Sequence, residues 1–96
     1  MYITADSSGE QSGNTLIMTG PCVMTGLQVV TDGTNDGKVV IHDNTSAAGT
    51  VKCEMTVVGA NHYGGRNWVA PIKFSTGIYV TGTGSGSTYF VETASP

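Results

Sequence analysis

The chain has 96 residues and a net charge of −3, from four Lys and Arg residues and seven Asp and Glu residues. This length supports one hydrophobic core, so a single domain is expected. The basic residues are widely spread and form no positive surface for a phosphate backbone, which argues against a nucleic-acid partner. No segment approaches the roughly 20 apolar residues that cross a bilayer, and the first residues lack signal-peptide character, so we expect neither membrane insertion nor secretion.

The composition favours strands over helices. Fourteen glycines, 14 threonines and eight serines supply turn residues and β-branched side chains. Short apolar runs recur between glycine-containing turns at intervals of about 8 to 12 residues, which is typical of a β-sandwich or barrel. Residues 1–13 lack this alternation and are predicted to form an N-terminal arm, followed by one β-sandwich domain over residues 14–96.

Seven strands are predicted directly from the apolar runs. In chain order they are 14–19, 22–31, 38–43, 50–58, 67–74, 78–81 and 88–93. The clearest is 50–58, in which four apolar residues alternate with Lys52, Glu54 and Thr56, as in a strand with one buried face. Pro71 predicts an edge strand or a bulge, because proline cannot donate a hydrogen bond to a neighbouring strand. The glycine-rich segment 82–86 predicts a terminal hairpin.

Two stacked sheets of three or four strands would bury these alternating residues. We therefore predict an all-β, antiparallel β-sandwich of seven or eight short strands, either jelly-roll or immunoglobulin-like. The periodicity of the sequence does not give the strand order. The core is expected to comprise Val23, Leu27, Val29, Val39, Ile41, Val51, Met55, Val57, Trp68, Ile72, Phe74, Ile78 and Val80. So small a core is marginal, and oligomerisation or docking on a larger assembly would stabilise it.

The segment 32–43 resembles a calcium-binding loop. Asp32, Thr34 and Asp36 occupy alternate positions, and Asp43 stands where a distal carboxylate would bind. Threonine as a ligand, the short side chain of Asp43 and the β-type run before it depart from that motif. We favour a hairpin turn through Asp36-Gly37, and we expect no bound metal and no cofactor.

Histidines and cysteines offer no clear catalytic or metal-binding arrangement. The spacing of His42 and His62 does not pair them, and Cys53 shares its parity with apolar neighbours, which indicates a small buried residue. Cys22 and Cys53 are too few for a disulfide framework, which fits synthesis in a reducing cytoplasm. No nucleophile elbow and no phosphate-binding loop is present, so we do not expect an enzyme.

Tyr63 and Tyr79 are the aromatic residues expected to face solvent, since Trp68 has the parity of the core. These two residues and the adjoining loops are the basis of one functional hypothesis, in which the chain is a module that binds a carbohydrate or a cell-surface receptor.

Two segments, HDNTSAAGT (42–50) and PIKFSTGIYVTGTG (71–84), resemble a pattern in short virion proteins of tailed bacteriophages. In that group an aspartate-containing turn ends one strand, a loop of small residues ends in Gly-Thr, and a proline-aromatic-glycine-aliphatic series leads into the last hairpin. The resemblance implies a β-sandwich that decorates or cements the capsid, or else a head-fibre, neck or tail component.

The same resemblance implies a place on the virion surface after synthesis in the host cytoplasm, with the major capsid protein as the partner. It also implies a homo-oligomer, preferably a trimer, because decoration proteins often occupy threefold or quasi-threefold axes. The arm, residues 1–13, has no counterpart in the group and is expected to order only on the partner surface. The candidate partner contacts are Tyr2, Ile3, Tyr63, Arg66 and Tyr79.

Overall fold

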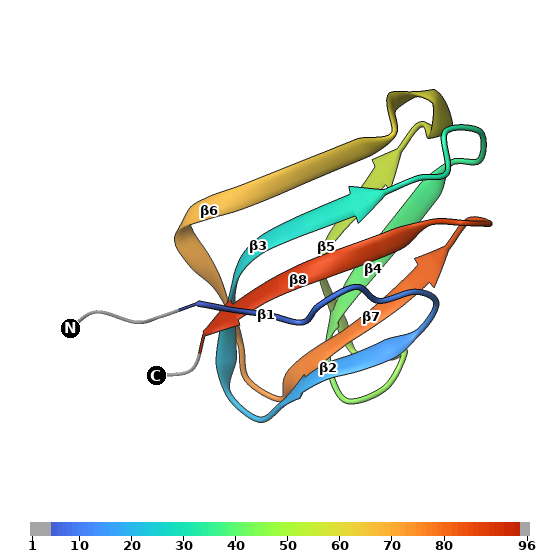
Figure 1. Ribbon diagram of the computed structural model, residues 1–96. Coiled ribbons are helices and arrows are strands. Elements are labelled where there is room, and N and C mark those ends of the chain that lie inside the picture. The colour runs from blue at the N-terminus through green and yellow to red at the C-terminus, as the bar shows by residue number, and fades with distance from the viewer. Residues whose placement is uncertain (1–4, 95–96) are drawn as a thin grey trace.

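The structure of the protein, a computed structural model, describes residues 5–94, and these form eight strands and one short 3₁₀ helix (Figure 1). The strands are β1 (Asp6–Ser7), β2 (Thr15–Thr19), β3 (Cys22–Val30), β4 (Gly37–Asp43), β5 (Thr50–Val57), β6 (Tyr63–Phe74), β7 (Gly77–Thr83) and β8 (Thr88–Ala94), and the helix η1 spans Gly59–Asn61. The all-β prediction is confirmed. No helix within the described residues has the length and hydropathy required to cross a bilayer.

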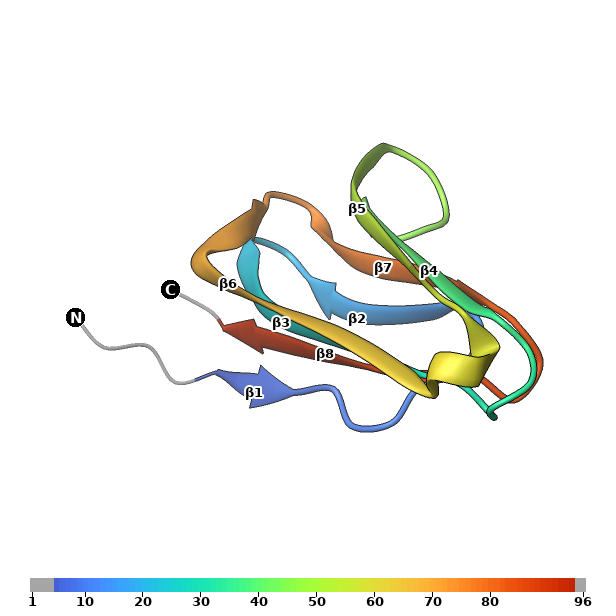
Figure 2. The same ribbon diagram turned by 90° about the horizontal axis from the view of Figure 1, so that it is seen from above.

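The strands form two antiparallel four-stranded sheets that stack as two layers (Figure 2). Sheet A has the order β1-β8-β3-β6, and sheet B has the order β2-β7-β4-β5. The chain is thus one long hairpin with β4 and β5 at its tip, followed outward by the pairs β3/β6, β2/β7 and β1/β8. Rolling such a hairpin into two sheets produces a jelly roll, one of the two predicted sandwich topologies.

Most connections between consecutive strands cross from one sheet to the other. Within residues 5–94, only β4 and β5 are consecutive neighbours in the same sheet. The predicted hairpins at 32–37 and 82–86 are therefore wrong: the first connects β3 in sheet A with β4 in sheet B, and the second connects β7 in sheet B with β8 in sheet A. The same glycine and aspartate chemistry serves a sheet-to-sheet connection and a hairpin, so the sequence does not distinguish them.

The core lies between the sheets, and both contribute to it. Its buried members are Cys22, Met24, Leu27, Val29, Val39, Ile41, Val57, Phe74, Ile78, Val80, Tyr89 and Val91. Met55, Trp68 and Ile72, predicted to be inside, are only partly buried against this core. They belong to β5 and β6, which are edge strands, so no further strand covers them on one side. The prediction that Pro71 lies in an edge strand is confirmed.

Two predicted core residues are placed wrongly because the register shifts. Pairing of β3 shifts between Met24 and Gly26, so Met24 is fully buried whereas Val23 is only partly buried. Val51 is 49% exposed, because a shift in the β4–β5 pairing places it opposite His42 on the outer face. An extra residue in one strand exchanges the inner and outer faces beyond that point.

The segment predicted as an arm lies along β8 from Asp6 onward. The backbone N–H of Gln11 donates to the carbonyl of Tyr89 at 2.9 Å, and the N–H of Tyr89 donates back to Gln11 at 2.9 Å. The Tyr89 hydroxyl donates to the carbonyl of Gly13 at 2.8 Å. Backbone pairing therefore holds this segment without apolar alternation, and the expectation that it orders only on a partner is wrong for residues 5–13. Residues 1–4 lie outside the described residues.

Candidate functional site

The candidate contact residues lie on different surfaces. Tyr63 and Arg66 belong to β6 at the edge of sheet A, whereas Tyr79 belongs to β7 in sheet B and points away from the core between buried neighbours. Tyr63 and Tyr79 therefore lie on the outer faces of opposite sheets, and they cannot together form one carbohydrate- or receptor-binding surface. Tyr2 and Ile3 lie outside the described residues.

A row of largely apolar residues crosses the outer face of sheet B. Leu16 pairs with Tyr79, Tyr79 pairs with His42, and His42 pairs with Val51, so one residue of each strand stands directly opposite the next. We call Leu16, Tyr79, His42 and Val51 the sheet B row. The first and last members are 45% and 49% exposed. A solvated sheet face normally carries polar residues, so this row is typical of a surface that contacts another protein.

The middle of the sheet B row is held by side-chain contacts. The rings of His42 and Tyr79 meet edge to face, with centroids 6.4 Å apart and an interplanar angle of 62°. His42 Nε2 lies 3.1 Å from Thr81 Oγ1 on the neighbouring strand. These contacts fix the two rings on the strand pair β4–β7, so the central part of the row is a preorganised surface.

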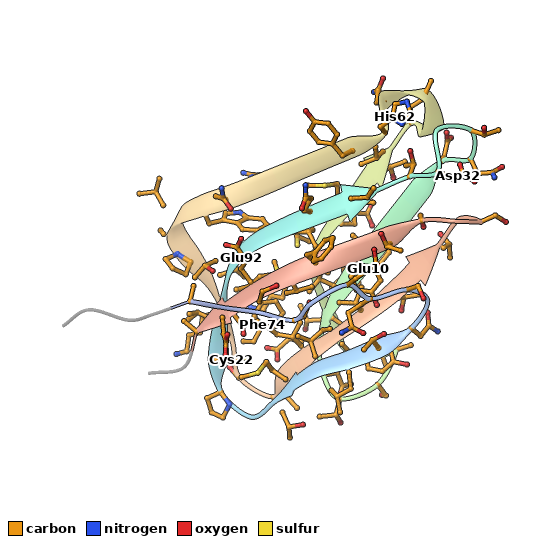
Figure 3. The ribbon with its side chains drawn as sticks, viewed as in Figure 1. Glu10, Cys22, Asp32, His62, Phe74 and Glu92 are labelled. Atoms are coloured by element: carbon orange, nitrogen blue, oxygen red, sulfur yellow. The ribbon has the colours of Figure 1, made fainter. Side chains whose placement is uncertain are left out.

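A cleft lies on the outer face of sheet A, over β6, β3 and β8. It has a volume of about 400 Å³, and its lining includes Gln28, Tyr63, Gly65, Asn67, Phe90 and Glu92. We call it the sheet A cleft. These residues come from three strands, and Glu92 marks its position on the sheet in Figure 3.

Strand register explains how the cleft forms. Gln28 on the central strand stands opposite Gly65 of β6 and Phe90 of β8. At the next outward-facing position, Gly26 stands opposite Asn67 and Glu92. A Cβ atom on Gly26 would lie 2.5 Å from Asn67 Oδ1 and 2.7 Å from Glu92 Oε1. The two side chains thus converge over Gly26, which has no side chain to separate them.

Arg66 borders the open side of the sandwich between β5 and β6. Its guanidinium carbon lies 5.3 Å from the centre of the Trp68 ring, a cation–π arrangement.

The two cysteines are structural residues. Burial raises the pKa of the Cys53 thiol, and the positive charge of Arg66 opposes this shift only partly. Burial also raises the pKa of the Cys22 thiol, and the negative charge of Asp43 raises it further, by a smaller amount. Both thiols are free and stay protonated at neutral pH, as expected of structural residues.

The carboxylates of the calcium-like segment each accept hydrogen bonds from different backbone N–H groups. Asp32 Oδ1 accepts from Thr34 at 2.9 Å and from Asn35 at 2.8 Å, and Asp36 Oδ1 accepts from Gly59 at 2.8 Å. These bonds from Asn35 and Thr34 hold the pKa of Asp32 below its usual value. Asp43 accepts from the turn before β7. The acidic side chains thus hold loops, and across residues 5–94 no three His, Cys, Asp or Glu side chains gather closely enough to hold a metal.

The two histidines lie apart. His42 is on the outer face of sheet B, and His62 follows η1 at the end of the sandwich that also holds Asp32 (Figure 3). A Cβ on Gly33 would lie 2.8 Å from His62 Cε1, so the imidazole packs on this loop. The opposite end of the sandwich carries the paired residues Cys22 and Phe74 (Figure 3). No histidine pair for metal binding or proton transfer forms within the described chain.

The sequence alone did not predict most residues of the sheet B row and the sheet A cleft. Gln28, Asn67, Phe90 and Glu92 are polar or aromatic residues at ordinary outward positions of three different strands. Their proximity depends on the pairing of β3 with both β6 and β8, which links residues 33 to 71 positions apart, from Val30–Tyr63 to Val23–Ala94. Only strand order and register could have revealed the cleft.

The fold and these surfaces define a small jelly-roll domain in which the outer face of one sheet carries an apolar row and the outer face of the other carries a cleft. Comparison of the chain with protein-family models, with curated proteins and with solved structures finds no match. The chemistry of the two surfaces and the sequence resemblance are therefore what point to a function.

Proposed function

We propose that the protein is a structural component of a tailed-bacteriophage virion that binds the head shell as a decoration, or cement, protein. The sheet B row is the observation that carries this proposal. The two segments that resemble phage virion proteins, 42–50 and 71–84, lie side by side through the pairing of β4 with β7. They contribute His42 and Tyr79, the centre of the row, and the exposed Leu16 and Val51 flank them on the neighbouring strands.

The chemistry of the row suits a static contact with a protein shell. Leu16 and Val51 each leave nearly half of their surface exposed, and neither carries a charge. Apolar contacts of this kind are not weakened by salt, whereas exposed ion pairs are. Under this proposal the major capsid protein covers the row, and attachment survives high ionic strength.

A homo-oligomer, with a trimer preferred from the resemblance, is part of the same proposal. The edge strands β5 and β6 are long, at eight and 12 residues, and each leaves one side without a partner strand in the described chain. Unpaired edges are the usual sites of strand addition between subunits. Light scattering of the purified full chain measures its molecular mass in solution. A monomeric mass at all concentrations would contradict the proposed homo-oligomer.

The deciding experiment mixes the purified protein with undecorated heads of the phage that encodes it, at low and high salt. We expect saturable binding at hundreds of copies per head, unaffected by salt. Leu16→Glu and Val51→Glu should abolish binding because they bury a charge in the contact. Thr83→Glu introduces the same charge on β7 opposite Lys38, at the polar end of sheet B, and serves as the matched control.

Two outcomes would contradict this function. Failure of the wild-type protein to bind heads, or a few copies per native particle, would favour a neck, tail or head-fibre role. Normal binding by both glutamate variants would show that the row is not the contact surface, even if decoration itself is correct.

A further inference from the structure

We propose that the sheet A cleft binds a neutral saccharide. The proposal does not depend on shell docking, because the cleft lies on the sheet opposite to the sheet B row. It depends instead on an arrangement of aromatic, amide and carboxylate groups around a hollow.

A glycine on β6 creates the hollow. Gly65 occupies an outward-facing position between Tyr63 and Asn67 and has no side chain to fill the space beside Gln28, whereas the side chains of Asn67 and Glu92 cover Gly26. The resulting volume of about 400 Å³ falls within the roughly 300 to 1,000 Å³ typical of small-molecule sites. A ligand of one or two pyranose rings fits a hollow of this size.

Aromatic rings flank the hollow on two sides. Tyr63 on β6 is 67% exposed, and Phe90 on β8 is half-buried with its ring lining the cleft. The faces of such rings are electron-rich and attract the weakly positive C–H groups on the face of a sugar ring. The exposed ring of Tyr63 is therefore accessible to a ligand in the cleft.

Planar polar groups complete the site. Gln28, Asn67 and Glu92 are exposed, and their side chains take no part in the side-chain hydrogen bonds formed within residues 5–94. An amide offers both donors and an acceptor, and a carboxylate offers two acceptors. Adjacent sugar hydroxyls can pair with both oxygens of Glu92 or with the oxygen and nitrogen of one amide.

The charge at the cleft disfavours an anionic ligand. Glu92 is the acidic side chain among the lining residues, whereas Arg66 alternates with the outward-facing Gly65 and Asn67 and places its guanidinium over Trp68, which packs against the core. A phosphorylated or acidic sugar would meet the Glu92 charge. A neutral polyhydroxylated ring pairs with this carboxylate through its hydroxyl groups without that penalty.

Binding can be tested on the ¹⁵N-labelled full chain by nuclear magnetic resonance. The probes are lactose, cellobiose, maltose, mannobiose and diacetylchitobiose, which together present the common neutral pyranoses. We expect at least one to shift the side-chain amide signals of Gln28 and Asn67, with a Kd on the order of 0.1 to 1 mM. Absence of such shifts for all five sugars at about 20 mM, well above that Kd, would overturn the proposal.

Two substitutions locate the site. Tyr63→Ala should weaken binding about tenfold through lost stacking. Gly65→Val should abolish binding by filling the hollow; because the new Cβ would lie 3.3 Å from the Leu27 carbonyl oxygen, the strand must shift by a few tenths of an ångström, and a melting curve checks that the variant is folded. Thr56→Val is the control for a valine at an exposed strand position away from the cleft, since Thr56 lies on β5 in sheet B.

The outcomes separate this proposal from the shell-docking proposal. Tyr63→Ala and Gly65→Val should bind phage heads like the wild type, and a sugar-binding protein that fails to bind heads would contradict only the decoration role. Shifts confined to residues outside the cleft, or equal sugar binding by wild type, Tyr63→Ala and Gly65→Val, would overturn the saccharide site.

Discussion

The Asp43 carboxylate accepts a hydrogen bond from the backbone N–H of Thr76 at 2.9 Å, so a side chain at the end of β4 holds the turn between β6 and β7. The same carboxylate accepts from Ser75 at 3.1 Å and from Gly77 at 3.4 Å. This contact ties together the two segments that carry the phage resemblance, 42–50 and 71–84. A three-donor carboxylate is a strong anchor, because hydrogen bonds to a charged group are worth more than neutral ones.

Asp43→Ala should therefore lower the free energy of unfolding by about 1 to 3 kcal/mol. It leaves the N–H groups of Ser75 and Thr76 without their acceptor, and urea unfolding measures the loss. Asp43→Asn keeps one acceptor oxygen and should cost less. Equal stability of Asp43→Ala and wild type would contradict the anchoring role.

The same carboxylate predicts acid sensitivity. The N–H donor of Thr76, then those of Ser75 and Gly77 and the charge of Lys52, hold the pKa of Asp43 below its ordinary value of about 3.9, although burial opposes them. Because the folded-state pKa is lowered, this stabilisation is complete above that ordinary value and is lost as the pH falls through the folded-state pKa. Melting temperatures of wild type and Asp43→Asn should therefore differ most at neutral pH and converge in strong acid.

Tyr89→Phe should loosen the N-terminal segment. The substitution removes the hydrogen bond to the Gly13 carbonyl and leaves the ring buried, so we expect a loss of about 1 kcal/mol. Amide hydrogen exchange should accelerate at Gln11, which pairs with residue 89, more than at Val80 in the core of sheet B. Uniform acceleration at both sites would indicate a general loss of stability and no local role.

Gly59→Ala should be strongly destabilising, because a Cβ there would overlap the Thr34 carbonyl group. The Gly59 N–H also donates to Asp36, and its carbonyl accepts from the Thr31 hydroxyl at 2.7 Å, so this glycine joins η1 to the loop after β3. We expect a loss of about 2 to 4 kcal/mol, measured by chemical denaturation. Gly65→Ala is the control: its Cβ would approach the Leu27 carbonyl oxygen to 3.3 Å, a contact that needs a shift of only a few tenths of an ångström, so its loss of stability should be much smaller.

Calcium, chelator and reductant should leave the melting curve unchanged. Asp32 and Asp36 already accept backbone hydrogen bonds from separate loops, and calcium binding would have to break them. Cys22 and Cys53 are both free thiols, so reductant has no bond to cleave. Scanning calorimetry under each condition provides the test, and a rise in melting temperature with calcium would reveal a metal site through binding linkage.

The alternation of apolar and polar residues by itself determined the fold class and most of the strands. Segment 50–58 was predicted as a half-buried strand and corresponds to β5, because side chains alternate between faces along any extended chain. Leu27, Val29 and Ile41 were placed in the core for the same local reason, and all are buried. The start of β6 at Tyr63 was missed, since Gly64 and Gly65 suggest a loop when considered alone.

Only the tertiary structure decided which strands pair, where the register shifts and which side chains meet. Val23 and Val51 were predicted on the wrong face, because a shift in the pairing of two neighbouring strands exchanges their inner and outer faces. The sequence of neither strand alone shows such a shift. The sheet B row, from Leu16 to Val51, and the convergence of Asn67 with Glu92 arise in the same way. The physical reason is that backbone periodicity is a local property, whereas pairing depends on the packing of the whole chain into two sheets.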